Sequence, residues 1–362
     1  MAILGQMKDP RRTSKGNLKH SLIDILFLVV SAVVSGCNDW ESIEVFGESQ
    51  LEWLRKFYPY KHGIPSHDTM NRVFSALDPK VFGEKFIEWT QQVCKLTEGE
   101  LVAIDGKTIR RSYDSHREQA AFHVVSAYAA KNRICLGQVL TSQKSNEITA
   151  IPALLDMLFL KGTTVTIDAM GCQKSVVEKI VSKKADYLIA VKNNQKTLFE
   201  QIDKLFTITQ PASVDEQTGI DHGRVEARKC TIITDLTFFD ESKAWAGIKG
   251  VVKIETERHI KSSGVTTKES RFYITSHQGQ AAKINQMVRE HWSIENKLHW
   301  MLDVVFGEDS SRRRTGNSAT NFNIISKVAL ALIERTPHKK SKRQRRFKAG
   351  FDPVFREKVL NL

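Results

Sequence analysis

The chain has 362 residues, of which 41% are hydrophobic and 26% charged, as in an ordinary soluble globular protein. It carries 54 lysine and arginine residues against 41 aspartate and glutamate residues, and this net charge of +13 points to a polyanionic partner, nucleic acid before membrane. Its five cysteines are scattered without a CxxC pair, which argues against a disulfide framework or a zinc knuckle.

One apolar stretch near the start of the chain resembles a secretion signal. Residues 22–34 are nearly all apolar and follow the basic residues Lys8, Arg11 and Arg12. However, Asp24 interrupts the run, which is also too short to span a bilayer, so a buried amphipathic helix explains it better. We therefore expect a cytoplasmic protein that does not engage a membrane.

Residues 1–98 are predicted to form an N-terminal helical domain, whose first 20 residues are a short basic arm. Apolar residues at helical spacing predict helices over residues 22–35, 40–58, 67–77 and 79–96. The third of these starts with good capping residues and turns Asn71 and Arg72 outward. DNA binding, of helix-turn-helix type, is the working prediction for this domain, and a helical packing module with solvated charges is the open alternative.

From residue 99 the pattern changes to strands and helices. Strands are predicted over residues 101–105, 122–130, 133–142, 163–168 and 186–192, and helices over residues 147–159, 173–183 and 195–206. Three strands followed by alternating helix and strand is the order of a ribonuclease-H-like (RNase-H-like) mixed sheet with flanking helices. The sequence thus predicts an α/β catalytic domain over residues 99–335.

This alternation is interrupted by residues 208–280, which are rich in valine, isoleucine and threonine. They are expected to form a β-rich insertion with strands over residues 228–234, 250–260 and 265–275. The helical pattern returns at Ala281, and a further helix is predicted over residues 318–335. Residues 336–362 are expected to be a basic C-terminal tail that adds salt-sensitive DNA affinity, although a solvated tail without that role has the same composition.

Three acidic residues are the candidates for chemistry. Asp105 and Asp168 each end an apolar strand where the chain leaves for a loop, a common place for a functional site. Alternation along the first strand places Asp105 on the same face as Leu101 and Ala103. Taken alone, each aspartate has the ordinary alternative of a turn or helix-capping residue.

The third acid, Glu295, falls inside an apolar stripe formed at helical spacing by Val288, Trp292, Leu298 and Leu302. A carboxylate that faces a core is costly unless it is paired or holds a metal. Three converging carboxylates would repel one another unless divalent cations lie between them, and oxygen ligands suit Mg²⁺ or Mn²⁺. Two such ions can activate a water or a sugar hydroxyl against a phosphodiester.

Several longer motifs resemble those of the bacterial insertion-sequence DDE transposases, in particular the H-repeat-associated group, over nearly the whole chain. They are Ile-Asp-Gly-Lys-Thr at 104–108, Lys-Ser-Asn-Glu-Ile-Thr-Ala-Ile-Pro at 144–152, Asp-Ala-Met-Gly-Cys-Gln-Lys at 168–174, Asp-Tyr-Leu-Ile-Ala-Val-Lys at 186–192, His-Gly-Arg at 222–224 and His-Trp-Ser-Ile-Glu-Asn-Lys-Leu-His-Trp at 291–300. The resemblance implies an RNase-H-like domain with a β-strand insertion between the second and third acids, and DNA transposition as the activity.

By this resemblance, Asp105, Asp168 and Glu295 match the family's three metal-binding acids, and two Mg²⁺ ions per site, replaceable by Mn²⁺, are the expected cofactors. The implied reaction is metal-assisted hydrolysis at insertion-sequence ends, followed by joining of the 3′-hydroxyl to target DNA. The implied partners are double-stranded DNA, as terminal inverted repeats and as target, and further copies of the chain in a homodimer or larger multimer on DNA.

The residues around the third acid depart from the wider superfamily, which often has Tyr, Arg and Lys there. The Tyr and Lys positions hold Val288 and Leu302, and the Arg position holds His291. DNA contacts are therefore expected from a broader set, for which surface salt bridges, or roles in balancing and supporting the acids, are the alternatives. This set is Lys107, His222, Arg224, Arg289, His291, Lys297, His299, Arg312, Arg313 and Arg314.

Two other functions stay open. A nuclease with the same fold would stop at hydrolysis without strand transfer. A DNA-binding protein without catalysis, such as a decayed transposase that acts as a repressor, would need only the basic surface. The presence of Asp105, Asp168 and Glu295 together argues against decay.

Overall fold

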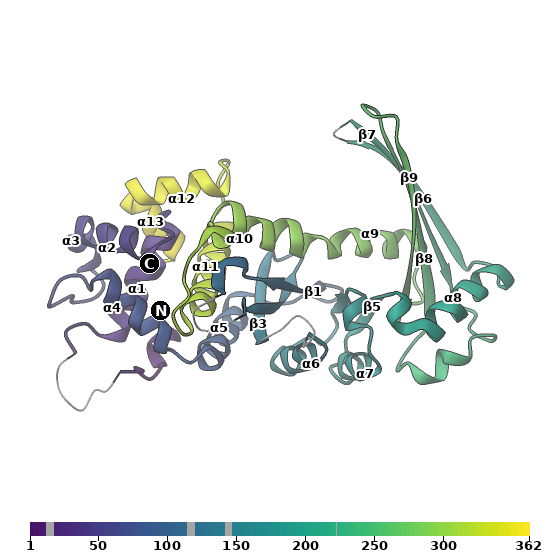
Figure 1. The fold of residues 1–362 in the computed structure, drawn as a ribbon, viewed down its shortest axis with the longest axis horizontal. Helices are drawn as coiled ribbons and strands as arrows, with labels where there is room; N and C mark the ends of the chain where they lie inside the picture. Colours follow the sequence, from purple (N-terminus) through teal and green to yellow (C-terminus); the bar gives the residue numbers. More distant parts are fainter. Residues whose placement is uncertain (12–17, 114–119, 142–146, 222) are drawn as a thin grey trace.

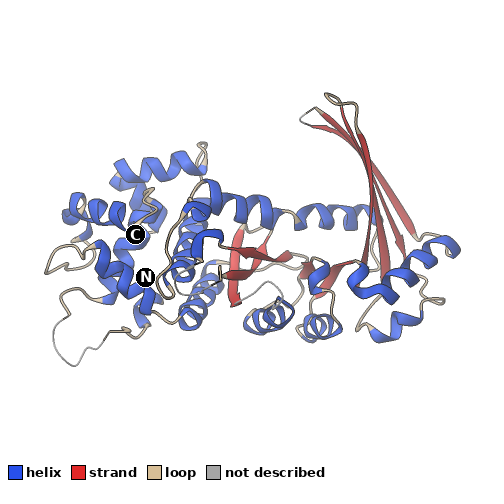
Figure 2. Ribbon diagram, viewed as in Figure 1, coloured by secondary structure: helices blue, strands red, loops and turns tan. Residues whose placement is uncertain are grey.

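The computed structural model describes residues 1–11, 18–113, 120–141, 147–221 and 223–362. The molecule is elongated (Figure 1). A helical body that contains both termini lies at one end, a β-sheet with flanking helices occupies the middle, and a long β-ribbon projects at the other end. Strands are confined to the middle and to the ribbon end (Figure 2).

The helical body confirms the predicted N-terminal helices, with one break in the second. Their bounds are α1 Leu22–Val34, α2 Trp40–Ser49, α3 Leu51–Leu54, α4 His67–Ala76 and α5 Pro79–Val93. Ser21, Asp39, Ser66 and Asp78 cap α1, α2, α4 and α5 by accepting a backbone N–H. Of these helices, α1, α4 and α5 pack on α11 (Ser318–Arg335), so the body is built from both ends of the chain.

The segment predicted to be a basic C-terminal tail contains two helices. Residues in this segment form α12 (Lys342–Phe351) and α13 (Pro353–Leu360), which pack on α1 and α11. The buried guanidinium of Arg346 donates to the Val33 carbonyl and to Asn38 Oδ1. Arg346 therefore satisfies a carbonyl at the end of α1, where helix carbonyls lack intrahelical partners.

The middle of the molecule is an RNase-H-like sheet, as predicted. Its strands are β1 Leu101–Thr108, β2 His123–Ala129, β3 Ile134–Thr141, β4 Thr164–Ile167 and β5 Asp186–Val191, in the order β3-β2-β1-β4-β5. β1, β4 and β5 are parallel, and β2 runs antiparallel to β1 and β3. Helices α6 (Glu147–Met157) and α7 (Lys174–Ser182) lie below the sheet in Figure 1, and α9 (Ala281–His291) crosses above it.

The insertion continues this sheet instead of forming a separate unit. After α8 (Lys196–Ile208) come β6 Ser213–Asp221, β7 Arg224–Ile233, β8 Gly250–Ile260 and β9 Thr266–Thr275. β9 pairs with β5, which extends the sheet to nine strands ending at β6. β6 was not predicted because its sequence is polar; its pairing with β7 along its whole length holds it extended.

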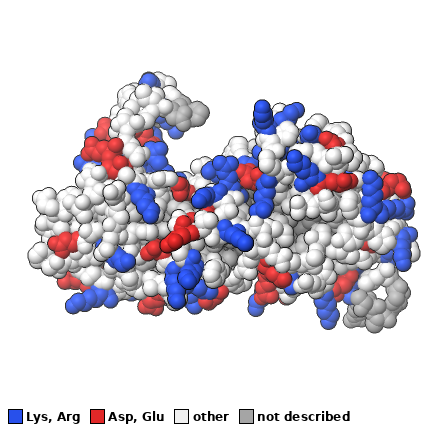
Figure 3. All heavy atoms as spheres, turned by 180° about the vertical axis from the view of Figure 1, so that it is seen from behind, with Lys and Arg blue, Asp and Glu red and all other residues white. Residues whose placement is uncertain are grey.

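Charged side chains are spread along the length of the face drawn in Figure 3. On the face in Figure 3, lysine and arginine are interspersed with aspartate and glutamate over both the helical body and the sheet region. The excess of positive charge is thus not confined to a terminal segment. Among the described helices, none combines the length and the hydropathy needed to cross a bilayer.

Candidate active site

Asp105 and Asp168 are adjacent because of the register of two parallel strands. The pairing of β1 with β4 ends at Ile104 and Ile167, so the two aspartates are the next residues on the two strands. β1 itself continues to Thr108 through its pairing with β2, which is longer than predicted. The strand thus carries Asp105 past the point where β4 stops, and Asp105 lines a cavity together with residues at the end of α9.

Asp168 also begins the short turn Ala169–Gly171, and its Oδ1 accepts the backbone N–H of Met170 at 3.0 Å. The ordinary capping role and the predicted site role are therefore both present at this residue. The loop after β5 supports this turn, since Asn194 Nδ2 donates to the Ala169 carbonyl at 2.7 Å. This contact fixes the backbone that carries Asp168.

Glu295 lies beside the site, but for a different reason than the one predicted. The helix after α9 changes to a π-helical turn, Ile294–His299, before α10 (Trp300–Val304). The wider turn shifts the apolar stripe, so Ile294 is buried whereas Trp292 is 40% exposed. Glu295 is exposed and does not face the core. Spacing by 3.6 residues fails here because the helix is not an α-helix at this point.

The three acids line one cavity of about 320 Å³. Its wall combines the ends of β1 and β4 with β5, β9, the end of α9 and the π-helical turn. Besides Asp105, Asp168 and Glu295, the lining includes Thr166, Lys192, Arg271, Tyr273, His291 and Trp292. The structure therefore brings together the three acids that the sequence singled out.

The carboxylates in this cavity repel one another. Burial and the charge of Asp168 raise the pKa of Asp105 to about 7, with further contributions from Glu147 and Glu295. Burial also raises the pKa of Asp168, against the hydrogen bond from Met170. Within the described part of the chain, no lysine or arginine forms an ion pair with any of the three acids.

Carboxylate oxygens that are not ion-paired with a described lysine or arginine suit hard divalent cations such as Mg²⁺ or Mn²⁺. Over the described ranges, no three side chains of His, Cys, Asp or Glu already enclose a single ion. A set of acids spread along a cavity wall can instead share two ions between pairs of carboxylates. The chemistry of the residues present therefore fits divalent cations, whose number stays a prediction.

Two predicted DNA-contacting histidines support the acids. His291 Nδ1 lies 2.9 Å from Thr166 Oγ1, and burial lowers the pKa of His291 to about 4. His299 Nδ1 lies 3.5 Å from Asp105 Oδ2, and burial lowers its pKa to about 3, so it stays neutral beside this carboxylate. His291 thus contacts the strand that ends at Asp168 and His299 contacts Asp105, while contacts of either histidine with DNA stay predictions.

Two predicted cationic DNA contacts are occupied within the protein. Lys107 forms ion pairs with Asp303 and with Glu308, the latter at 2.6 Å, and its side chain is 14% exposed. The guanidinium of Arg313 packs on the Phe322 ring and donates to the Asn38 carbonyl. These contacts assign both charges to internal packing and do not support the predicted contacts with DNA.

None of the other predicted cations within the described residues lines the cavity of the acids. Arg289 and Lys297 line a second cavity, of about 640 Å³, on another side of α9. Arg224 starts β7 at the exposed tip of the ribbon, and His222 lies outside the described residues. Arg312 is exposed, and Arg314 packs over the Tyr113 ring. The contacts of these residues with DNA remain predictions.

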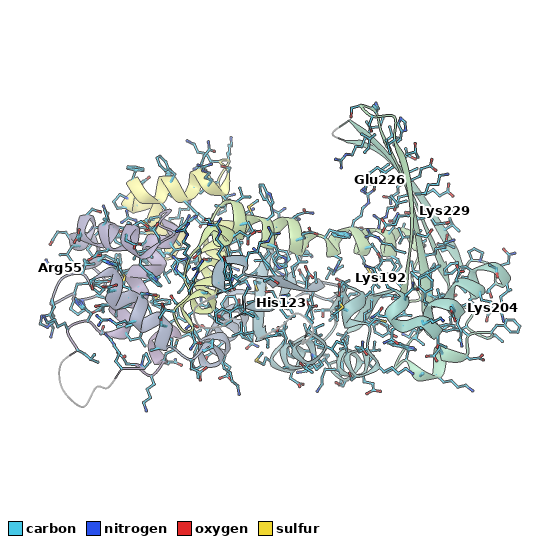
Figure 4. All side chains as sticks on the ribbon, viewed as in Figure 1. Arg55, His123, Lys192, Lys204, Glu226 and Lys229 are labelled. Carbon is cyan, nitrogen blue, oxygen red and sulfur yellow. The ribbon has the colours of Figure 1, made fainter. Side chains whose placement is uncertain are left out.

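Two cations at the cavity were missed by sequence reasoning. Lys192 follows β5, and Arg271 lies on β9 with its guanidinium 5.3 Å from the Trp292 ring centre. Figure 4 shows Lys192 between the central sheet and the base of the ribbon. Lys192 ends a motif that was noticed, but Arg271 could be found only from the pairing of β5 with β9.

Comparisons with known proteins agree with this architecture. A family model described as "Transposase DDE domain" matches residues 96–332, and one described as "DDE_Tnp_1-associated" matches residues 1–90. The chain is 42% identical over 359 residues to "Putative transposase YncI" of Escherichia coli O157:H7, covering 97% of this chain and 92% of that one. It is 39% identical over 362 residues to "H repeat-associated putative transposase YhhI" of E. coli K12, covering 97% and 95%.

Among solved structures, the piggyBac transposase synaptic complex with hairpin DNA is similar at a TM-score of 0.43 and 11% identity. The match covers 97% of this chain and 76% of that one. At this level the likeness carries no argument about the site.

Proposed function

The chain belongs to the DDE transposase family, and on that premise we propose that it cleaves the ends of an insertion sequence and joins them to target DNA. The observation that carries the proposal is the convergence of Asp105, Asp168 and Glu295 on one cavity, where no described lysine or arginine is ion-paired with any of them. The substrates are double-stranded DNA at the terminal inverted repeats and at the target. The reaction takes place in the bacterial cytoplasm, where such DNA lies.

In this proposal the three acids would hold two Mg²⁺ or Mn²⁺ ions, and such ions would supply Lewis-acid activation of the attacking water or 3′-hydroxyl and of the leaving oxygen. The chain's own residues set the geometry. The end of β4 fixes Asp105 and Asp168 side by side, and the hydrogen bond between Thr166 and His291 ties that strand to the helix that leads to Glu295. Rigid placement of this kind is what an in-line displacement requires.

Lys192 and Arg271 are the cations placed to meet the DNA backbone at the cavity. Both line it, and neither is ion-paired with the three acids. Arg271 pairs instead with Glu269 at 2.7 Å, a contact that an incoming phosphate could replace. Two element ends must be joined in one event, so the active form is a dimer or a larger multimer on DNA.

The test incubates the full chain with DNA fragments that carry the element ends, a target plasmid and Mg²⁺ or Mn²⁺. Covalently joined products support transposition. Cleavage without joining would instead indicate a nuclease of the same fold. Equal cleavage by wild type and Asp105→Asn would overturn the site, and DNA binding without any cleavage would favour a repressor.

A further inference from the structure

A buried histidine–glutamate pair lies on the opposite face of β1 from Asp105. His123 starts β2 and Glu147 starts α6, and Nε2 of the first lies 2.6 Å from Oε1 of the second. The two side chains are 3% and 6% exposed. Because a carboxylate only accepts, His123 donates through Nε2, and its Nδ1 accepts from the Thr108 hydroxyl at 3.0 Å. Figure 4 places His123 within the central sheet.

This pair lies against the backbone of β1 directly after Asp105. A Cβ atom on Gly106 would come within 2.4 Å of both His123 Nε2 and Glu147 Oε1. No side chain fits there, so glycine at this position is required by the pair. The glycine of the Asp-Gly-Lys motif thus has a specific neighbour, which is the Glu147 carboxylate.

Glu147 also acts on the acids of the cavity. Its charge contributes to the raised pKa of Asp105, and it is the leading charged group among the causes that raise the pKa of Asp168. Among the described residues, its hydrogen-bond partner is His123, and no lysine or arginine forms an ion pair with it. A buried carboxylate placed behind two others is costly for the fold alone. That cost is offset when a cation binds in front of them.

We propose that Glu147 is a fourth acidic residue of the catalytic centre, held in position by His123 and by the space at Gly106, and that it strengthens the binding of divalent ions at Asp105 and Asp168. This inference rests on the proposed function, because it needs ions at those two residues. It goes beyond the three acids because it gives a role in ion binding to Glu147, the first residue of α6, on the other face of the sheet. His123 is a positioning residue, since it acts through Glu147.

The test measures the melting temperature of the full chain at increasing Mn²⁺ concentrations. Glu147→Gln keeps the shape of the side chain and removes its charge. We expect the Mn²⁺ concentration that gives half of the full stabilisation to rise about tenfold or more. A half-saturating Mn²⁺ concentration within about twofold of the wild-type value would overturn the inference.

Glu100→Gln is the matched control. Glu100 is 2% exposed and accepts the backbone N–H groups of Lys131 and Asn132 at the turn between β2 and β3. Its replacement makes the same chemical change in a buried site at the other end of β1. The melting temperature should fall, whereas the half-saturating Mn²⁺ concentration should stay that of wild type. If both variants weaken Mn²⁺ binding equally, the effect is structural and the inference fails.

Asp105→Asn in the same titration separates this inference from the proposed function. If Asp105→Asn loses the Mn²⁺ response and Glu147→Gln keeps a normal one, the proposed role of Glu147 is contradicted, whereas the proposed site at Asp105 is supported. A wild type without any Mn²⁺ response would sink the proposed site itself. Should Glu147→Gln not fold, Thr108→Val removes the hydroxyl that orients His123, and it should also raise the half-saturating concentration. An unchanged titration there would contradict the inference.

Discussion

Thr166 Oγ1 and His291 Nδ1 lie 2.9 Å apart, which joins the strand that ends at Asp168 to the helix that leads to Glu295. Two residues earlier on the same strand, Thr164 Oγ1 lies 3.0 Å from His277 Nε2. Both threonines are buried and each meets one histidine. Only the first pair adjoins the acids, so the two pairs offer a matched comparison.

Thr166→Val should impair the chemistry, and Thr164→Val should not. Each variant leaves a histidine nitrogen without its partner, which should lower the free energy of unfolding by about 1–2 kcal/mol. We expect the rate of end cleavage to fall only in Thr166→Val, because only that bond fixes Glu295 relative to Asp168. Denaturant unfolding and single-turnover cleavage measure the two effects. Equal cleavage rates in the two variants would contradict this role for His291.

The metal-free protein should lose stability as pH rises. The pKa of Asp105 is raised from 3.8 to about 7 by burial and by Asp168. Between these values the folded state binds more protons than the unfolded state, so the free energy of unfolding falls as pH increases through this range.

Asp105→Asn removes this penalty. In the presence of a chelator at about pH 8, it should be more stable than wild type by up to about 4 kcal/mol, and below about pH 4 the difference should vanish. Denaturant unfolding at the two pH values measures it. If the wild type is as stable as the variant at high pH, the ionised Asp105 carboxylate does not destabilise the fold, and the prediction is contradicted.

Lys107 should matter for folding more than for DNA affinity. Replacing it with methionine leaves the carboxylates of Asp303 and Glu308 in a partly buried place without their cation. We expect a loss of about 3–5 kcal/mol in the free energy of unfolding. Affinity for DNA, measured on the folded variant at several salt concentrations, should keep the wild-type salt dependence. A reduced salt slope would restore Lys107 as a phosphate contact.

Deletion of residues 336–362 should destabilise the whole helical body. α12 and α13 cover α1, and Arg346 and Arg356 are buried with their guanidinium groups on main-chain carbonyls and polar side chains. The shortened chain should therefore aggregate or melt at lower temperature. A well-folded deletion variant that only binds DNA more weakly would support the tail that the sequence suggested.

The sequence predicted the sheet and two of the acids because their signals are local. Asp105 and Asp168 follow short apolar strands, and the order of strands and helices limits the topology. Glu295 was identified through a mistaken reason, since a π-helical turn cannot be seen in a spacing of 3.6 residues. The resemblance to known transposases supported that residue where the periodicity did not.

Other features depend on contacts between distant segments. β6 is held by β7, and the charges of α12 are satisfied by carbonyls of α1. Arg313 resembles a surface cation in the sequence until Trp40 and Phe322 are brought around it. Glu147 is preceded by a polar stretch, and only the close approach at Gly106 connects it to the acids. Local pattern contains none of this information.

The most direct test of the central claim is the position of Mn²⁺ in crystals of the full chain bound to its end DNA, located by anomalous scattering. We predict two ions within about 2–2.5 Å of carboxylate oxygens of Asp105, Asp168 and Glu295. Ions bound elsewhere in crystals of an active protein, with these three carboxylates free of metal, would contradict the account.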